Sequence, residues 1–314
     1  MFQDRGLRVI TVDLDPQAGL TELMVDPDRL EGLWQSQPLR SPDLGRTVYD
    51  CVAPLIHGGR DVLSPALEMI SDSERLALVL GDLRLSTFED ELATNWTACL
   101  GGQKGALRVI SMFWQVIQRA AAKHEAHLVL LNLGPSLGAT TRAALISADF
   151  VTVPLSPDHF SLQSVRILGS SAHRWRQEWQ SCLSQNLESH ELQLPTGKME
   201  PVGYIIMHHP MRLDRPVGAY ERCFRRIPQT YRGSVLAVSE AAAIRVCDDE
   251  CCIGQIKHYP GLIPMAQEAR KPIFHLKPAD GALGSHFIAV QEVEKHFRKL
   301  AADLALRIGV EFSS

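Results

Sequence analysis

The sequence lacks any strong bias in charge, apolar runs or cysteine pairing, and each absence excludes a class of protein. Its 32 Lys and Arg residues nearly balance its 36 Asp and Glu residues, so the net charge of −4 gives no global electrostatic footprint for nucleic acid. No apolar run approaches the roughly 18 residues that a membrane-spanning helix needs, so we expect no membrane association. Seven cysteines, an odd number without a secretory leader, favour reduced thiols in a cytoplasmic protein over a disulfide framework.

A second absence concerns phosphate binding. A phosphate loop of the form G-x-x-x-x-G-K-[ST] offers a nest of backbone N–H groups and a lysine to the phosphates. The stretch "GGQKGA" from Gly101 lacks the final Gly-Lys-Ser/Thr, and Gly197-Lys198 is followed by Met199 with no glycine five positions before Gly197. These 314 residues therefore contain no such loop.

An alternation of strand and helix patterns is present instead. Short β-branched apolar runs predict buried strands, and apolar residues at three- and four-residue spacing predict helices between them. This alternation predicts a mainly parallel sheet with helices on both faces. The expected strands are 7–14, 150–155, 202–207 and a short one at 234–238, and a strand with its turn is expected at 75–85 and at 127–138. The expected helices are 106–126, 139–147, 159–183, 215–226 and 287–308.

The same rhythm runs from one end of the chain to the other, so we expect a single domain over residues 1–314. Residues 26–75 are rich in Pro, Gly and Asp and predict a loop-rich insertion. Residues 184–201 are polar and contain proline, which favours a surface connection over a domain boundary. Residues 1–5 followed by Gly6 read as the last turn of a helix with its glycine stop, as if the helix had lost its beginning.

Two acids mark the end of the first strand, in "VDLDPQAGLT". The proline after Asp15 turns the chain and leaves Asp15 and Gln17 at the rim of the sheet, where ligands bind in open α/β folds. An alternative is purely structural: Asp15-Pro16 starts a turn, and Asp13 caps a helix. On this motif alone both interpretations stay open.

A second motif favours the ligand site. "HLVLLNLGPSLGATTRAALISADFVTVPLSPDHFSL" joins a buried strand, a Gly-Pro-Ser turn, an alanine-rich helix and another buried strand. Together with "DLDPQ", this pattern resembles the ParA/MinD family of P-loop ATPases. The resemblance covers most of the chain and includes "GDLRLSTFEDEL" at 81–92 and "PMAQEARKPIFHLKPADGALGSH" at 264–286.

The resemblance implies a fold, a ligand and a set of roles. The fold is a three-layer α/β P-loop NTPase of the ParA type, whose dimers use ATP and Mg²⁺ to position plasmids, chromosomes or other cargo. The implied partners are a second copy of the chain, DNA bound without sequence preference, and a ParB-like or cargo protein. Asp13 and Asp15 match the acids that manage the Mg²⁺-bound water and the attacking water. The residues matching the nucleotide side are Gln17, Asn132 and the switch turn of Gly134, Pro135 and Ser136.

Two departures from the family pattern bear on activity. The family places its phosphate loop in a strand–loop–helix unit directly before the "VDLDPQ" strand, so we expect the first strand and that loop to be missing ahead of Met1. Asn132 stands where the family has a Walker B aspartate, and an amide is a poorer magnesium ligand than a carboxylate. We therefore expect Asp13 and Asn132 to form a degenerate magnesium site.

Three functions stay open on these grounds. The first is a partition-type ATPase in degenerate or N-terminally truncated form. The second is a non-catalytic scaffold that keeps the fold to bind a partner, which Asn132 favours. The third is a remnant that does nothing alone.

Two weaker patterns have structural explanations. Cys247, Cys251 and Cys252, with His258 nearby, lack the paired C-x₂-C spacing of zinc sites, so we expect no metal there. The stretches at 173–180 and 222–232 mix basic and aromatic residues as nucleic-acid faces do, but solvated helix faces with buried aromatics explain them more simply.

Overall fold

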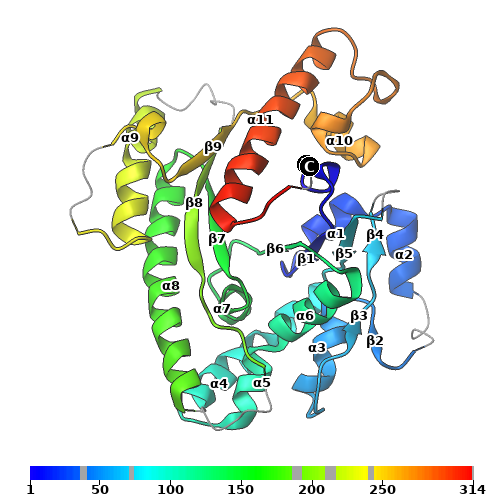
Figure 1. Cartoon of the computed structure of the whole chain (residues 1–314), viewed down its shortest axis with the longest axis vertical. Helices are drawn as coiled ribbons and strands as arrows, with labels where there is room; N and C mark the ends of the chain where they lie inside the picture. The colour runs from blue at the N-terminus through cyan, green and yellow to red at the C-terminus, as the bar shows by residue number, and fades with distance from the viewer. Residues whose placement is uncertain (36–40, 71–73, 186–192, 209–216, 240–243, 313–314) are drawn as a thin grey trace. The chain divides into compact units, whose positions relative to one another are not determined.

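The computed structural model describes residues 1–35, 41–70, 74–185, 193–208, 217–239 and 244–312 (Figure 1). The chain divides into two compact units. The first comprises Met1–Asp149, Arg176–Lys198 and Val310–Ser314, and the second comprises Phe150–Trp175 and Met199–Gly309. The single domain over 1–314 stays a prediction.

The first unit contains a four-stranded sheet in the order β4 (Glu68–Met69), β5 (Leu76–Val79), β1 (Val9–Asp13) and β6 (Leu128–Asn132). β1 is parallel to both of its neighbours, and β4 is antiparallel to β5. All five residues of β1 are buried, as expected for a central parallel strand. Among the described residues β6 is hydrogen-bonded on one side only, and its Leu130 is exposed although the strand is wholly apolar up to Asn132.

Helices cover both faces of this sheet. α1 (Gly19–Met24) and α2 (Pro27–Gln35) pack against Leu78 and Leu80. Side chains alternate along a strand, so the buried Ala77 and Val79 face the opposite side, where α6 (Met112–His124) contacts β1 and β6. The remaining elements of the unit are η1 (Gln3–Arg5), β2 (Leu44–Gly45), α3 (Val48–Ile56), β3 (Ser64–Pro65), η2 (Leu83–Phe88), α4 (Glu89–Leu100), α5 (Lys104–Ile110) and α7 (Ala139–Ile146).

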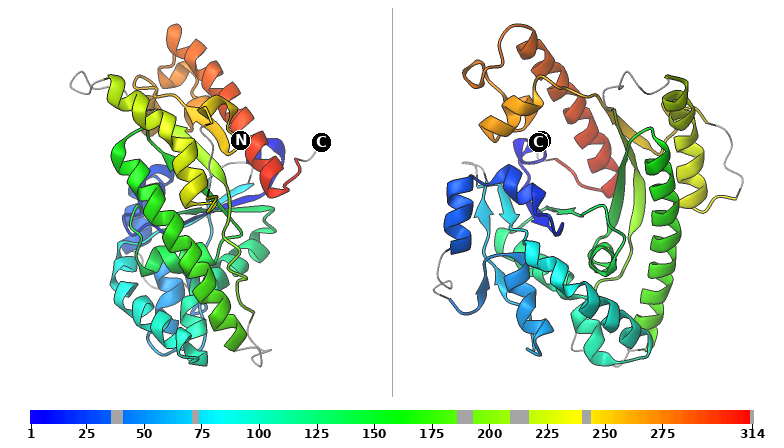
Figure 2. Two further views of the ribbon diagram at one scale, coloured as in Figure 1. Left: turned by 90° about the vertical axis from the view of Figure 1, so that its left-hand side faces the viewer. Right: turned by 180° about the vertical axis from the view of Figure 1, so that it is seen from behind.

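The second unit is built on the parallel strands β7 (Phe150–Leu155), β8 (Glu200–Met207) and β9 (Cys252–Ile256). α8 (His159–Gln185) enters this unit with its residues up to Trp175, and it covers one face of the sheet together with α9 (Val217–Ser234) (Figure 2). α11 (Ser285–Ile308) lies on the other face, where it contacts β8 and β9. The remaining elements are η3 (Val246–Asp248), α10 (Ile263–Ala269), η4 (Ile273–His275) and η5 (Pro278–Asp280).

The predicted alternation of parallel strands and helices is confirmed, with differences at particular elements. The strand expected at 234–238 is wrong, because α9 continues to Ser234 and a turn follows in which Val235 N donates to Tyr231 O. Strand β9 was not predicted. The helix expected over 106–126 is interrupted at Ser111, whose hydroxyl donates to the Leu107 carbonyl and separates α5 from α6.

Segments expected to be irregular also contain regular structure. Within 26–75 the described residues include α2 and α3 besides three short strands, and α3 begins with a capping box formed by Thr47 and Asp50. The opening residues form only η1, which ends at Gly6 in the left-handed conformation with φ of 90°. In the connection at 184–201, residues 186–192 lie outside the described residues, and the Pro195 carbonyl accepts from the buried indole of Trp179.

A buried acid fixes the core of the second unit. The Asp249 carboxylate accepts from Tyr204 Oη at 2.7 Å and from Arg232 Nη2 at 2.6 Å. Burial opposes its ionisation, but the bonds from Tyr204 and Arg232 outweigh burial and hold the pKa of Asp249 below its usual range. The neighbouring Asp248 is exposed and accepts from Arg245 and Cys247.

Asp249→Asn should therefore destabilise the second unit, whereas the matched change Asp248→Asn should not. Loss of the charge leaves Arg232 without its partner beside a buried amide, which we expect to lower the free energy of unfolding by about 2–4 kcal/mol. The Asp248–Arg245 pair is exposed, and solvent screens it, so its loss should leave the stability essentially unchanged. Urea unfolding followed by circular dichroism measures both, and equal stabilities for the two variants would contradict this account of Asp249.

Candidate functional site

The end of β1 carries a completely buried carboxylate. Asp13 has no exposed side-chain surface. Its Oδ2 accepts two hydrogen bonds from Thr21 in α1, from the backbone N at 2.9 Å and from Oγ1 at 2.8 Å. Thr21 Oγ1 in turn accepts from Gly81 N at 2.8 Å. One carboxylate thus connects β1, the first turns of α1 and the loop after β5.

Asn132 lies directly opposite Asp13 in the register of β1 and β6. Its Nδ2 donates to Asp13 Oδ1 at 2.9 Å, and its backbone carbonyl accepts from Leu14 N at 2.9 Å. The two residues that the sequence assigns to a magnesium site are therefore neighbours. Their proposed role as metal ligands stays a prediction.

Asp15 forms the turn that the sequence predicts after the strand. Its Oδ1 accepts from Gln17 N at 2.9 Å, and the Gln17 side chain is exposed. Gly134 approaches this carboxylate so closely that a Cβ at that position would lie 2.7 Å from Asp15 Oδ1. A larger residue at position 134 would have to displace the Asp15 side chain, and the close approach places the predicted switch turn beside Asp15. The other two turn residues, Pro135 and Ser136, are both exposed.

The two interpretations of "VDLDPQ" describe the same geometry. Asp13 accepts from an N–H group in the first turn of α1, as a helix cap does, and Asp15 closes a turn. Both nonetheless lie at the carboxyl end of a parallel strand, together with Asn132 and Gly134. The structural roles are visible, and the catalytic roles of Asp13 and Asp15 stay predictions.

Sequence reasoning missed Glu89, the first residue of α4, whose carboxylate caps the N-terminus of α7 just after the switch turn. Its carboxylate accepts from Ala139 N, from Thr140 N at 3.0 Å and from Thr140 Oγ1 at 2.6 Å. Burial opposes ionisation of Glu89, but the hydrogen bonds from Thr140 and Ala139 outweigh it and hold its pKa below the usual range. The cap comes from a distant part of the chain, so no local sequence signal could have found it.

A second network follows β5 in the segment 81–92. The buried Asp82 accepts from Thr47 Oγ1 at 2.7 Å and from the Arg84 guanidinium, which also donates to Asp50 at 2.9 Å. Burial opposes ionisation of Asp82, but the bonds from Arg84 and Thr47 outweigh it and lower its pKa. This network fixes the loop that begins at Gly81 and so supports the donor to Thr21.

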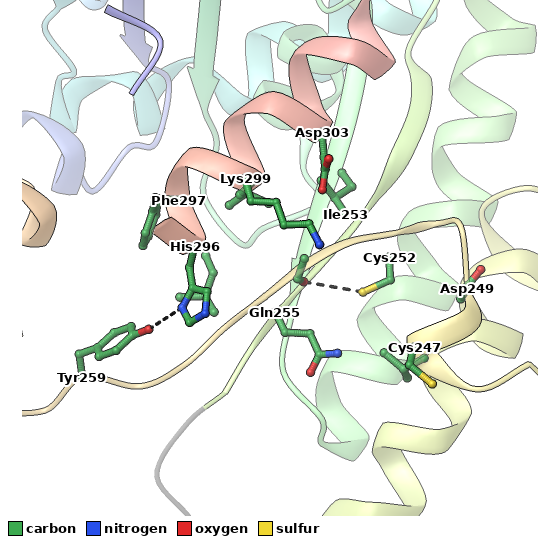
Figure 3. Close-up of a pocket in the computed structure, with 14 residues that line it drawn as sticks. Cys247, Asp249, Cys252, Ile253, Gln255, Tyr259, His296, Phe297, Lys299 and Asp303 are labelled. Atoms are coloured by element: carbon green, nitrogen blue, oxygen red, sulfur yellow. Dashed lines mark hydrogen bonds between the residues drawn. The ribbon is translucent and has the colours of Figure 1, made fainter. Parts of the chain in front are cut away.

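The described residues hold no group of three or more His, Cys, Asp or Glu side chains arranged for a metal ion. Cys247 is exposed, whereas Cys251 and Cys252 are half-buried. Beside them, a pocket of about 320 Å³ in the second unit lies between β9 and α11 (Figure 3). Its polar lining mixes Lys299 with Asp303, and Tyr259 Oη lies 3.2 Å from His296 Nδ1.

The basic and aromatic stretches form solvated helix faces over a buried aromatic side. Trp175, Trp179 and Tyr231 are buried, whereas Arg225 and Arg226 are exposed on α9. His208 contacts Tyr220 and Gln255, and its neighbour His209 lies outside the described residues. Over the described ranges, no helix combines the length and the apolar character needed to cross a bilayer.

Comparisons with known proteins relate this geometry to a family. A family model described as an AAA domain matches residues 1–185. A candidate replication protein A of Rhizobium rhizogenes is 26% identical over 161 residues, which are 51% of this chain and 35% of that protein. This chain thus spans about a third of the length of that curated relative.

Two solved structures show the same fold. Protein DIP2308 of Corynebacterium diphtheriae has a TM-score of 0.67 at 18% identity, covering 98% of this chain and 91% of that one. A single-residue variant of McdA from Cyanothece, solved as a complex with ATP, has a TM-score of 0.51 at 12% identity, covering 99% of this chain and 89% of that one. At these identities the similarity shows the fold alone.

Glu89→Gln should weaken the cap of α7, while the matched change Glu91→Gln on the exposed side of α4 should not. We expect Glu89→Gln to lower the free energy of unfolding by about 1 kcal/mol. Because the folded pKa of Glu89 lies below its unfolded value, this contribution is present above about pH 4.3 and is lost as the pH falls through the folded pKa. Denaturant unfolding from pH 7 to pH 3 measures the difference, and a gap that does not narrow in acid would contradict the role of the charge.

Proposed function

We propose that this chain, which belongs to the ParA/MinD-like P-loop ATPases of the AAA-domain family, is a degenerate or N-terminally truncated member of that family of partition and positioning ATPases. On this proposal its 314 residues neither bind ATP·Mg²⁺ tightly nor hydrolyse ATP by themselves. The observation that carries the proposal is the absence of any G-x-x-x-x-G-K-[ST] motif from the sequence. ATP is present in the structure of the Cyanothece McdA variant, so the fold itself is suited to the nucleotide.

The missing motif matters because it supplies most of the phosphate affinity. Backbone N–H groups at a helix N-terminus and a lysine neutralise the triphosphate charge. The rim described here offers the carboxylate of Asp15 and the exposed side chain of Gln17 instead. A carboxylate repels phosphate, so the rim alone supports only weak nucleotide binding.

Asn132 supports the same proposal, because it predicts slow hydrolysis even where nucleotide is bound. Phosphoryl transfer depends on positioning and on positive charge near the developing oxyanions, which a metal ion supplies when one is bound. Asn132 donates its amide to Asp13 and contributes no negative charge that could anchor such an ion. On the proposal, Asp15 positions water at the rim, and Gly134 keeps the switch turn against it.

A non-catalytic scaffold is the second candidate, and a specific observation favours it. The carboxylate of Asp13 is satisfied entirely by protein donors, so the strand end is ordered without a ligand. The proposed partners are a second copy of the chain, a ParB-like or cargo protein, and DNA contacted through the exposed arginines of α9. Of these arginines, Arg225 is paired with Glu221, whereas Arg222 and Arg226 have no ion-pair partner among the residues that the structure describes.

Titration calorimetry of the chain with ATP·Mg²⁺ tests the proposal directly. We expect a dissociation constant of about 1 mM or weaker, equivalent to about −4 kcal/mol, since the phosphates find no nest of amides and no loop lysine. A family member that has the intact loop, titrated under the same conditions, is the control. A micromolar constant for this chain would mean that another segment binds the phosphates.

A hybrid chain separates the loop from Asn132. If a strand, phosphate loop and helix from a family ATPase are placed ahead of Met1, we expect ATP binding to return with slow hydrolysis. Asn132→Asp in this hybrid should raise turnover at least about tenfold, roughly 1.4 kcal/mol in activation free energy, and Asp15→Ala should abolish the gain while ATP still binds. Equal turnover with and without Asn132→Asp would refute the degenerate-site proposal.

A further inference from the structure

We infer that the amide of Asn132 takes the structural place of a cation beside Asp13, in a bond network that needs no metal, and that Asn132→Asp converts this network into a divalent-cation site. The inference deepens the proposed function by giving a physical reason for the degenerate site. It rests on that proposal only for the expectation that a metal belongs there. Its test uses the metal alone, so it can fail while the nucleotide proposal stands.

Asp13 accepts hydrogen bonds from three residues. Its Oδ2 accepts from the N and the Oγ1 of Thr21. Its Oδ1 accepts from Asn132 Nδ2 at 2.9 Å and, at the longer distance of 3.4 Å, from Asp15 N. A carboxylate accepts hydrogen bonds and an amide carries both an acceptor and a donor, so the atom of Asn132 that faces Oδ1 is the amide nitrogen. Both carboxylate oxygens therefore have protein donors at normal hydrogen-bond distances.

The surroundings of Asp13 do not match what a magnesium ion needs. Mg²⁺ takes oxygen ligands at about 2.0–2.1 Å in an octahedron and is reluctant to give up its waters. Asp13 is fully buried with both oxygens engaged, and Asn132 presents hydrogens to it. Over the described parts of the chain, no third acid or histidine joins the pair as a ligand group. These residues do not fit a magnesium ion bound to Asp13.

The hydrogen bonds around Asp13 join several elements of the first unit. Thr21 Oγ1 donates to Asp13 and accepts from Gly81 N, while a Cβ on Gly81 would lie only 2.8 Å from Asp13 Oδ2. Asn132 adds β6 to this set. The buried carboxylate thus joins β1, α1, the loop after β5 and β6 through protein atoms alone. Asn132 acts as a positioning residue for Asp13.

Asn132→Asp would remove the hydrogen-bond donor that faces Asp13 Oδ1. The substitution replaces the donor by an acceptor and sets two carboxylates against each other inside the sheet edge, where like charges repel strongly. A divalent cation with its waters neutralises such a pair and converts the repulsion into attraction. The variant should therefore depend on a cation for stability, whereas the natural chain should not.

Thermal unfolding with and without metal tests this inference. We expect the Tm of the natural chain to be the same in EDTA and in millimolar MgCl₂ at matched ionic strength. Asn132→Asp should have a lower Tm in EDTA and recover by about 3 °C or more with MgCl₂ but not with KCl of equal ionic strength. Asn132→Ala should have a lower Tm that MgCl₂ does not restore, because it removes the donor without adding a ligand.

Asn95→Asp is the matched control for the change of charge. Asn95 donates its amide to Glu91 at 2.8 Å in a solvent-exposed hydrogen bond on α4, so this variant also sets two carboxylates together, but in water. We expect no MgCl₂-specific change in its Tm.

Three results would overturn the inference. They are a Tm of the natural chain that rises with MgCl₂ beyond the ionic-strength control, an Asn132→Asp variant as stable as the natural chain in EDTA, and an Asn132→Asp variant that is unfolded in both EDTA and MgCl₂. A variant that is unfolded in EDTA and folded in MgCl₂ supports it.

Discussion

The requirement that buried Asp13 be met by hydrogen-bond donors is the constraint on which the first unit depends. A carboxylate without exposed surface is tolerated only where donors surround it. Thr21 meets it from α1, Asn132 meets it from β6, and Gly81 approaches closely enough to support Thr21. Each of these residues is therefore fixed in space by one side chain at the end of β1. The rim beside Asp15 and Gly134 is ordered because this strand end is ordered.

Much of the fold can be predicted from the spacing of apolar residues, because this spacing reflects which side of each helix or strand is buried. The strand at Phe150–Leu155 and the long helices α8 and α11 lie within two residues of their predicted bounds, since each shows a continuous apolar run or face. The strand expected after Ser234 is absent although its sequence is apolar and β-branched. Cys223, Ile227 and Tyr231 are buried along one face of α9, and this packing carries the helix through the predicted boundary. The secondary structure at this boundary is therefore set by packing against other elements and not by local β propensity.

Some residues of the candidate site could be predicted from the sequence, and others could not. Acids that follow a buried strand, and a glycine in the turn after another, are local signals, so Asp13, Asp15 and Gly134 were found from the sequence. Glu89 was not found, because its partners Ala139 and Thr140 are far along the chain and only the fold brings them to its carboxylate. The orientation of Asn132 was also beyond the sequence. A neutral residue at a metal position predicts weak metal binding, whereas a donor aimed at Asp13 is a property of the register between β1 and β6.

The two departures from the family pattern depend on each other physically. In these folds the magnesium ion accompanies the nucleotide phosphates, and the phosphate loop holds both. If these 314 residues act without that loop, as we propose, nothing holds a cation at the end of β1. An aspartate at position 132 would then face Asp13 with no charge between them, and the buried pair would destabilise β1 and β6. An amide has nearly the same shape as a carboxylate, and it donates a hydrogen bond to Asp13 Oδ1 where a second carboxylate would repel it. On the proposed function, Asn132 is therefore the residue that keeps this strand end folded without a metal.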